Sequence, residues 1–346
     1  MSIRKTFIFV LFSVFLLVGC TKEEKVFKKT RTEMFTTVTI TVVSDSDKKA
    51  EEAINAGFAE IKRIGELINY FSPDSELTAI NRAAGKNPVK VSKDTLDTIK
   101  KAIHISDLTD GAFDPAIGPV IKLWGFSKDP SKRFVPAKDA VSNALRLIDY
   151  KKVKINEATS EVYLEDAGME LDLGGIAKGY GADKAIEVIK AKGIKAALVA
   201  IAGDIKGYGR RPDGQPWRVG VQNPRPKSDK KTSDSDDDIL TALYLIDQAV
   251  STSGDYERFF TQDGKRYHHI IDPKTGFPSE SQAISVSVIA PQGYISDGIS
   301  TGVFVLGSQK GIALLESMGL EGIIVDADMK IFITKGLKGK VEIPGM

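Results

Sequence analysis

Threonine and apolar residues alternate along Met34–Val43, and many of these residues are β-branched, so the segment is predicted to form a strand. From Ser46 the spacing changes. Apolar residues recur at steps of three and four as far as about Tyr70, which is typical of an amphipathic helix that ends before Pro73. The folded part of the chain is therefore expected to begin with a strand and a long helix.

The rest of the chain mixes short helical and strand patterns without regular βαβ alternation, and it contains no internal repeat. This mixture predicts an α+β fold. Further helices are predicted over Asp94–Leu108, Ala137–Ile148, Ala177–Lys192, Ser296–Leu306 and Lys310–Met318. Further strands are predicted over Lys152–Asn156, Glu161–Leu164, Met169–Leu173, Ala196–Ile201, Trp217–Val221, Ala242–Ile246, Ser285–Ala290, Gly322–Asp326 and Lys330–Thr334.

Residues 1–19 have the pattern of an export signal. Arg4 and Lys5 precede an apolar run, Thr6–Val18, that is too short to span a bilayer comfortably. The run ends in Leu-Val-Gly-Cys at 17–20, which resembles the lipobox of bacterial lipoproteins. On that resemblance Cys20 becomes the first residue of the mature chain and carries lipid. An ordinary signal peptide or an N-terminal anchor with an incidental cysteine is the alternative.

This interpretation divides the chain into a signal peptide (1–19), a polar tether (20–32) and one folded domain (33–346). Several acyl chains on one cysteine give a stable membrane anchor, whereas a single chain binds reversibly. We therefore expect an exported protein that is lipid-anchored to a bacterial membrane. Its folded domain is expected on the periplasmic or extracytoplasmic side.

The composition removes several classes of function. The 48 Lys and Arg residues nearly balance the 46 Asp and Glu residues, and no basic stripe is present, so nucleic-acid binding is not indicated. Cys20 is the only cysteine, which excludes an intramolecular disulfide framework, a Cys-rich zinc site and a protein-held iron–sulfur cluster. His104, His268 and His269 form no His-Glu-x-x-His motif, so a zincin is excluded too.

Six polar clusters do not suit simple core packing, although each one alone could be a turn or a helix cap. In the cluster Asp172–Tyr180, a predicted strand leads through Gly174 and Gly175 into a helix, an arrangement that suits anions. It is not a Walker A motif, because Tyr180 stands where that motif has lysine. The clusters are Phe71–Leu77 with Asn81, Thr109–Pro115, Asp172–Tyr180, Ala202–Asp204, Ser251–Tyr256 with Tyr267–Gly276, and Asp297–Thr301.

Two clusters carry more specific expectations. Asp297 and Thr301 are four residues apart on a predicted helix, so their oxygens can face one side and suit Mg²⁺; a helix-start carboxylate and a threonine bonded to the preceding turn are the alternative. If His268 and His269 lie in a strand, they point to opposite faces, so at most one of them should enter a given site.

Taken together and in this order, the clusters resemble those of the ApbE family, whose members attach FMN from FAD to a threonine of a target protein. The resemblance runs from Met34 to about Gly307 and is carried by Thr-Asp-Gly-Ala-Phe-Asp-Pro, Asp-Leu-Gly-Gly-Ile-Ala-Lys-Gly, Thr-Ser-Gly-Asp-Tyr, His-Ile-Ile-Asp-Pro-x-Thr-Gly and Asp-x-x-x-Thr. It implies a T-fold-like antiparallel sheet with helices on one face, plus additional α/β elements. Many members are also exported lipoproteins.

The resemblance implies a role for each matching position. Gly175, through its carbonyl, Asp297 and Thr301 match the metal site, for Mg²⁺ or Mn²⁺, and His269 matches the histidine before Ile-Ile-Asp-Pro. The positions that match the FAD site are Met34, Phe71, Ala112, Phe113, Asp114, Asp172, Lys178 and Ile271. This chain departs from the family in two places. Phe35 takes the place of the glycine in the usual Met-Gly-Thr, and Ala202-Gly203-Asp204 replaces Gly-Gly-Asp.

The resemblance implies a phosphoryl-transfer reaction in which a target threonine attacks the FMN-side phosphorus of FAD and AMP leaves. His269 is the candidate general base and Asp272 is its rival. The expected partners are FAD and the threonine-bearing domain of a membrane-associated redox protein. Two other functions stay open: an FAD pyrophosphatase that releases FMN and AMP, and an exported flavin-binding lipoprotein without turnover.

Overall fold

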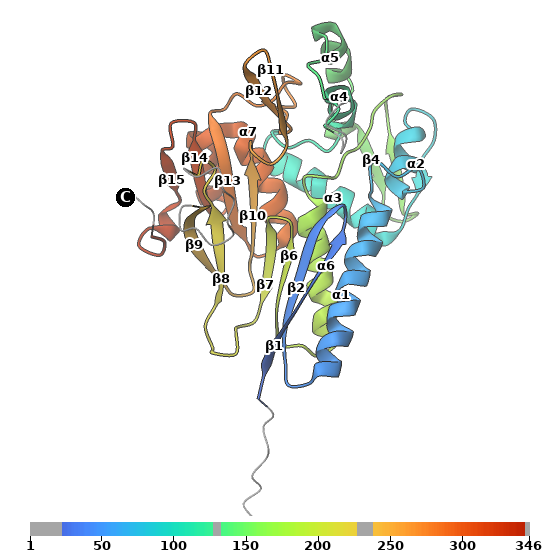
Figure 1. The fold of residues 1–346 in the computed structure, drawn as a ribbon. Helices are drawn as coiled ribbons and strands as arrows, with labels where there is room; N and C mark the ends of the chain where they lie inside the picture. Colours follow the sequence, from blue (N-terminus) through green and yellow to red (C-terminus); the bar gives the residue numbers. More distant parts are fainter. Residues whose placement is uncertain (1–22, 127–132, 227–237, 343–346) are drawn as a thin grey trace, which may run out of the picture.

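An eight-stranded sheet forms the framework of the protein (Figure 1). The structure, a computed structural model, describes residues 23–126, 133–226 and 238–342. The strand order is β1-β2-β6-β7-β10-β13-β14-β15, and each adjacent pair is antiparallel. The strands are β1 (Lys25–Glu33), β2 (Thr36–Ser44), β6 (Ala196–Ile201), β7 (Asp204–Tyr208), β10 (Ala249–Gly254), β13 (Ala283–Ala290), β14 (Glu321–Asp326) and β15 (Ile331–Ile333).

Helices cover one face of the sheet and a hairpin covers the other. The helices α1 (Asp47–Leu67), α6 (Ala177–Ala191) and α7 (Gly293–Ser317) pack against the strands and against one another. The hairpin of β8 (Trp217–Gln222) and β9 (Ile239–Leu245) shares a separate apolar cluster with the sheet. Neighbouring side chains of one strand point to opposite faces of the sheet. In β13, Val288 packs in the cluster on the helix side, and Ile289 packs in the cluster on the hairpin side. The predicted α+β fold, with helices on one face of an antiparallel sheet, is confirmed.

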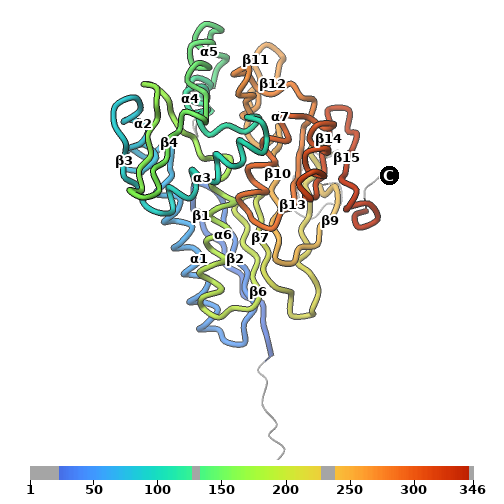
Figure 2. The backbone as a smooth tube through the Cα atoms, turned by 180° about the vertical axis from the view of Figure 1, so that it is seen from behind, coloured from blue at the N-terminus to red at the C-terminus, as the bar shows by residue number. Residues whose placement is uncertain are grey.

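Smaller elements gather at the end of the sheet opposite the point where β1 enters (Figures 1 and 2). They are α2 (Glu76–Arg82), α3 (Lys93–Leu108), α4 (Gly118–Trp124), α5 (Lys138–Leu145), a sheet of β3 (Val89–Lys90), β5 (Glu161–Leu164) and β4 (Val153–Asn156), and a hairpin of β11 (Phe259–Gln262) and β12 (Lys265–His268). Short 3₁₀ turns lie at Tyr150–Lys152 and Lys335–Leu337.

The predicted tether, residues 20–32, is wrong for its second half. Residues 20–22 lie outside the described residues, but Lys25–Glu33 form β1, which pairs with β2 along its whole length. An edge strand needs only main-chain pairing on one side, so a polar, mostly exposed sequence can form it. Lys29 pairs with Glu51 of α1 at 2.7 Å, and the Arg31 guanidinium lies over the Phe58 ring, so β1 is also held to α1.

The predicted strand Met169–Leu173 is also wrong. Asn81 satisfies the backbone at Leu171 in place of a neighbouring strand: the Leu171 N–H donates to Asn81 Oδ1 at 2.7 Å, and Asn81 Nδ2 donates to the Leu171 carbonyl at 2.9 Å. Asp172 N donates to the Pro115 carbonyl, and only a single bridge forms, between Glu170 and Ile117. The segment is therefore extended but tied to loops.

The two helices predicted near the C-terminus lie end to end within α7, and a non-helical backbone at Gly307 separates them. This glycine has a φ of 77°, and a Cβ there would lie 2.9 Å from the Ser281 carbonyl oxygen, so the position requires glycine. Among the described residues, α7 alone is long and apolar enough to cross a membrane by length and composition. It packs against β10, β13 and α6, so the core accounts for its apolar character.

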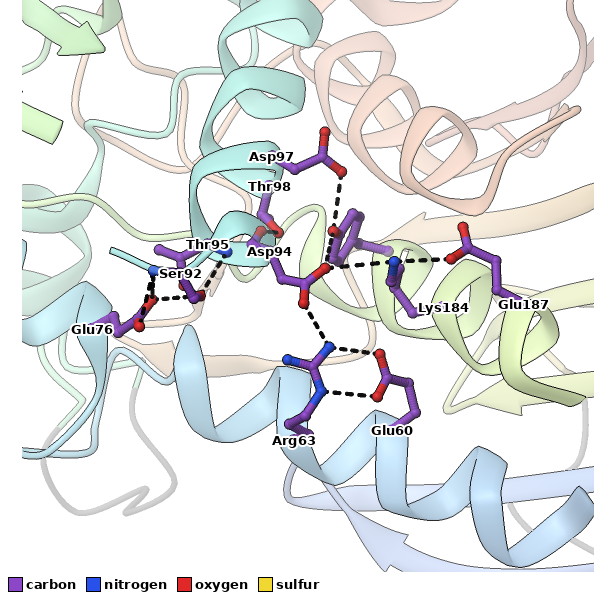
Figure 3. A network of polar contacts seen from close by, with 11 residues as sticks. Glu60, Arg63, Glu76, Ser92, Asp94, Thr95, Asp97, Thr98, Lys184 and Glu187 are labelled. Carbon is purple, nitrogen blue, oxygen red and sulfur yellow. Dashed lines mark hydrogen bonds and ion pairs between the residues drawn. The ribbon is translucent and has the colours of Figure 1, made fainter. Parts of the chain in front are cut away.

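A polar network fixes the start of α6 against α1 and α3 (Figure 3). The Tyr180 hydroxyl lies 3.1 Å from Asp94 Oδ1 and 3.0 Å from Asp97 Oδ2. Arg63 of α1 donates to Asp94 Oδ2 at 2.6 Å, and Lys184 of α6 pairs with Asp94 at 3.5 Å. Because Tyr180 is two residues beyond Lys178, these contacts set the position of the polar first turn of α6.

Candidate active site

Three charged side chains from distant parts of the chain meet beside the first turn of α6. Lys178 Nζ lies 2.7 Å from Asp204 Oδ2 and 3.3 Å from Asp297 Oδ1. Asp204 begins β7 and Asp297 lies in α7. Both aspartates are 3% exposed, whereas the Lys178 side chain is 31% exposed. The site therefore contains two buried carboxylates and one ammonium group.

Two glycines bring the elements of this cluster together. A Cβ on Gly179 would lie 2.1 Å from the Gly293 carbonyl oxygen, and a Cβ on Gly293 would lie 2.4 Å from the Gly179 carbonyl oxygen. The backbones of α6 and α7 thus touch where any larger residue would separate them. At this crossing the Gly179 N–H donates to Asp297 Oδ2 at 2.9 Å.

The charges of the cluster perturb one another. Burial raises the pKa of Asp297 to about 6, the Asp204 charge adds to this rise, and the Lys178 charge opposes it. Burial would lower the pKa of Lys178, but the two carboxylates outweigh it and raise that pKa above its ordinary value. One ammonium therefore faces two carboxylates, and the cluster has a net negative charge that a cation can neutralise.

The residues assigned to a metal lie together and supply hard oxygens. Gly175 stands beside Thr301, because a Cβ on this glycine would lie 3.5 Å from Thr301 Oγ1. Thr301 is one helical turn beyond Asp297, and its hydroxyl is 3.5 Å from the Asp297 carbonyl oxygen. Within the described residues no three His, Cys, Asp or Glu side chains gather as a metal cluster. One carboxylate with neutral oxygens fits Mg²⁺, which usually takes few protein ligands.

A row of hydroxyl groups joins β10 to α7 behind the metal candidates. Ser253 Oγ lies 2.8 Å from Ser300 Oγ and 3.2 Å from Thr301 Oγ1. One turn earlier, Ser251 Oγ lies 2.8 Å from Ser296 Oγ. The Thr-Ser-Gly-Asp-Tyr motif thus supports α7 from the sheet side and orients Thr301.

The adjacent histidines occupy different environments, and they do not share a strand, because β12 ends at His268 and His269 lies in the bend that follows. His268 is buried and its ring packs edge-on against Phe304, with centroids 5.4 Å apart. Its Nε2 donates to the Ser279 carbonyl oxygen, and its Nδ1 accepts from the Ile270 N–H. Because both ring nitrogens are used within the fold, His268 is a structural residue.

His269 keeps one ring nitrogen available. Its Nδ1 lies 3.2 Å from the Arg258 carbonyl oxygen, which can only accept, so Nδ1 carries the proton and Nε2 is left with a lone pair. Burial, and then the positive charges of Arg258, His268 and Lys178, hold the pKa of His269 well below its ordinary value. The imidazole is therefore neutral at pH 7, and the Lys178 charge reaches it.

Asp172 and Asp114 both use their carboxylates within the fold. Asp172 Oδ1 accepts from the Gly174 N–H at 2.7 Å and shapes the turn before α6; burial raises its pKa, while the Arg258 charge lowers it. Asp114 accepts from the backbone N–H groups of Ala116 and Tyr150, and burial raises its pKa to about 6. Their contacts with FAD stay predictions.

The other FAD candidates lie in different environments. Ala112 and Phe113 are buried, and the Phe113 ring lies 3.0 Å from the Cβ position of Gly175. Phe71 is 54% exposed and packs edge-on against Tyr70. Met34 is half-buried against both main apolar clusters, and Ile271 is buried in the cluster around Trp124. Of these five side chains, Phe71 is the one that is mostly exposed.

Asp272, the second candidate base, serves a turn. Its Oδ1 accepts from the Lys274 N–H at 2.8 Å, and its carbonyl accepts from the Gly276 N–H at 2.8 Å. With His268 it lines a cavity of about 330 Å³ between β12 and residues 275–280. The contact with Lys274 ties this carboxylate to the turn that borders the cavity.

Sequence reasoning missed three residues of the site. In the sequence, Asp204 belongs to a cluster that alone could be a turn, Ser253 is one residue of a motif, and Arg258 carries no signal. No local pattern distinguishes Asp204 from a turn aspartate, because its carboxylate pairs with Lys178, 26 positions away in the chain. The apolar strand that ends in Ala-Gly-Asp was the available signal.

Comparison with known proteins places these observations in a family. A model described as "ApbE family" matches residues 34–324. Proteins named FAD:protein FMN transferase match from Treponema pallidum (strain Nichols), 35% identical over 84% of this chain and 82% of that protein, and from Klebsiella pneumoniae (strain 342), 36% identical over 80% and 81%. The crystal structure of the ApbE protein of Thermotoga maritima aligns with a TM-score of 0.82 at 33% identity, covering 91% of this chain and 98% of that one. Flavin transferase ApbE from Vibrio cholerae aligns with a TM-score of 0.78 at 28% identity, covering 91% and 99%.

Proposed function

We infer that this protein is an FAD:protein FMN transferase, because the chain belongs to the ApbE family and its relatives carry that name. We propose further that the acceptor is a threonine of another protein and that the reaction needs Mg²⁺ or Mn²⁺. The observation that carries this proposal is the buried Lys178–Asp204–Asp297 cluster beside Thr301 and Gly175. Such a cluster suits a phosphate-bearing substrate together with a divalent cation.

The Asp297 carboxylate, the Thr301 hydroxyl and the Gly175 carbonyl would hold the metal ion. When bound, that ion supplies positive charge to the pyrophosphate as the P–O bond breaks. Lys178, at the start of α6, pairs with Asp204 and Asp297 and is proposed to contact a phosphate of FAD.

His269 is proposed as the general base. The acceptor threonine oxygen attacks the phosphorus on the FMN side, its proton moves to His269 Nε2, and the bond to the AMP phosphate breaks. The neutral ring and the free Nε2 support this role. The Asp272 carboxylate accepts from the Lys274 N–H within its own turn, and this contact weighs against Asp272 as the base.

The acceptor is proposed to be a threonine-bearing domain of a membrane-associated redox protein, outside the cytoplasm. The support for this location is the lipobox-like sequence at 17–20, which lies outside the described residues. Lipid on Cys20 would hold the enzyme at the same membrane as its target.

An incubation of the full chain with FAD, Mg²⁺ and a candidate target domain tests the proposal. Flavin fluorescence that stays on the denatured target supports covalent transfer to protein. Free FMN and AMP without labelled target would instead indicate an FAD pyrophosphatase, and unchanged FAD would indicate a flavin-binding protein without turnover. Substituting the acceptor threonine by valine should abolish labelling, and labelling undiminished by EDTA would contradict the requirement for a divalent metal.

A further inference from the structure

We propose that Asp204 is a positioning residue that draws the Lys178 ammonium toward itself and weakens its contact with Asp297, so that the Asp297 carboxylate is available to a divalent cation. The proposal rests on the metal part of the proposed function. It assigns a role to a residue outside the proposed metal and FAD sites.

The distances show which carboxylate holds the lysine. Lys178 Nζ is 2.7 Å from Asp204 and 3.3 Å from Asp297, so Asp204 is the closer partner. Asp297 also accepts from the Gly179 N–H at 2.9 Å. In the described parts of the chain, Lys178 is the one polar partner that the Asp204 carboxylate meets. A carboxylate that is 3% exposed and has a single cationic partner is bound to that partner.

The hairpin between β6 and β7 fixes where Asp204 stands. Ile201 pairs with Asp204 across a two-residue turn, and the Ala202 N–H donates to the Thr37 carbonyl of β2 at 2.9 Å. Asp204 thus comes from the rigid sheet, whereas Lys178 and Asp297 come from the helices. The sheet can hold the lysine in one place while the helical carboxylate changes its partner.

Charge balance gives the reason for a second carboxylate. With Asp204 ionised, the Lys178–Asp204 pair is neutral, and the Asp297 charge is left for a cation. Without the Asp204 charge, Lys178 would have only Asp297 as a partner, and the ammonium would compete with the metal ion for it. In a buried site this competition is strong, because opposite charges attract more than they do in water.

Binding of Mn²⁺ to the full-length chain without FAD tests this role, with free Mn²⁺ measured by electron paramagnetic resonance. Asp204→Asn should weaken binding about 10- to 100-fold, the usual effect of losing a residue that supports a metal ligand. The double variant Lys178→Met/Asp204→Asn should bind Mn²⁺ within about threefold of wild type, since the competing ammonium is gone. Asp213→Asn, an exposed aspartate paired with Arg211, is the matched control and should bind as wild type.

Each other result overturns the proposal. If Asp204→Asn binds Mn²⁺ as wild type does, Asp204 has no such role. If the double variant binds Mn²⁺ as weakly as Asp204→Asn does, Asp204 is either a direct ligand of the metal ion or a support of the β6–β7 turn. If the wild-type chain binds no Mn²⁺, the metal part of the proposed function fails together with this inference, whereas the first two results leave that function intact.

Discussion

The Gly293 carbonyl oxygen occupies the space in which Gly179 would carry a side chain, since a Cβ there would lie only 2.1 Å away. This contact lets α6 and α7 cross closely enough for the Gly179 N–H to reach Asp297 Oδ2. The position of Asp297 beside Lys178 therefore depends on two residues without side chains.

Gly179→Ala should force α6 and α7 apart. We expect a loss of about 1–3 kcal/mol in the free energy of unfolding, as for other overpacked contacts, together with weaker metal binding. Denaturant unfolding measures the loss of stability, and Mn²⁺ titration measures the weaker metal binding. Gly203→Ala is the control, because a Cβ there meets nothing within 4 Å. A Gly179→Ala variant as stable as this control would show that the two helices can separate without cost.

Ala202→Gly should stabilise the protein. Ala202 has a φ of 53°, in the left-handed region, which costs a residue with a side chain about 1–2 kcal/mol. Glycine removes that strain but adds about 0.4–1 kcal/mol of unfolded-state entropy, so a gain of up to about 1.6 kcal/mol is expected in denaturant unfolding. Ala200→Gly, in the interior of β6, should destabilise. Equal losses in the two variants would contradict the prediction.

His269→Ala should lower turnover by about 10²–10⁴-fold while FAD still binds, because general-base catalysis supplies that factor. The low pKa of His269 means that the base stays neutral, and turnover should stay level, as the pH rises from 7 to 8. His104→Ala, on an exposed part of α3, should act as wild type. The measurement is the pH–rate profile of His269→Ala beside that of Asp272→Asn. Near-normal turnover in the histidine variant and lost turnover in the aspartate variant would move the base to Asp272.

Asp114 should make stability depend on pH. Burial raises its pKa to about 6, against an ordinary value of about 3.9. Between these values the folded protein holds a proton that the unfolded chain has lost, so stability falls as the pH rises from about 4 to about 6. Relative to Asp114→Asn, wild type should lose on the order of 3 kcal/mol over this window. Denaturant unfolding of both proteins across the window measures it, and parallel pH profiles would refute the prediction.

Cys20→Ser should release the protein from the membrane. The change removes the lipid proposed for this residue, and with it the buried CH₂ groups that contribute about 0.8 kcal/mol each. Fractionation of cells into membrane and soluble parts measures the effect. If the serine variant stays as membrane-bound as wild type through an uncleaved N-terminus, the lipobox interpretation is wrong.

Several elements could be predicted from local patterns because local interactions determine them. The three- and four-residue spacing placed α1, α3 and α6, and the β-branched run placed β2, because each element needs one apolar face. The segments that failed depend on distant partners. Lys25–Glu33 is a strand only because β2 lies beside it, and Met169–Leu173 is not one because Asn81 takes its hydrogen bonds.

The same division holds for the site. The sequence alone determined that Asp297 and Thr301 share one side of a helix and that a glycine-rich turn precedes Lys178, since both follow from a few consecutive residues. Only the tertiary structure decided that Asp204 meets Lys178 and that His269, not His268, keeps a free ring nitrogen. Those outcomes depend on which backbones can approach each other, and the Gly179–Gly293 crossing and the pairing of strands across the sheet set that approach.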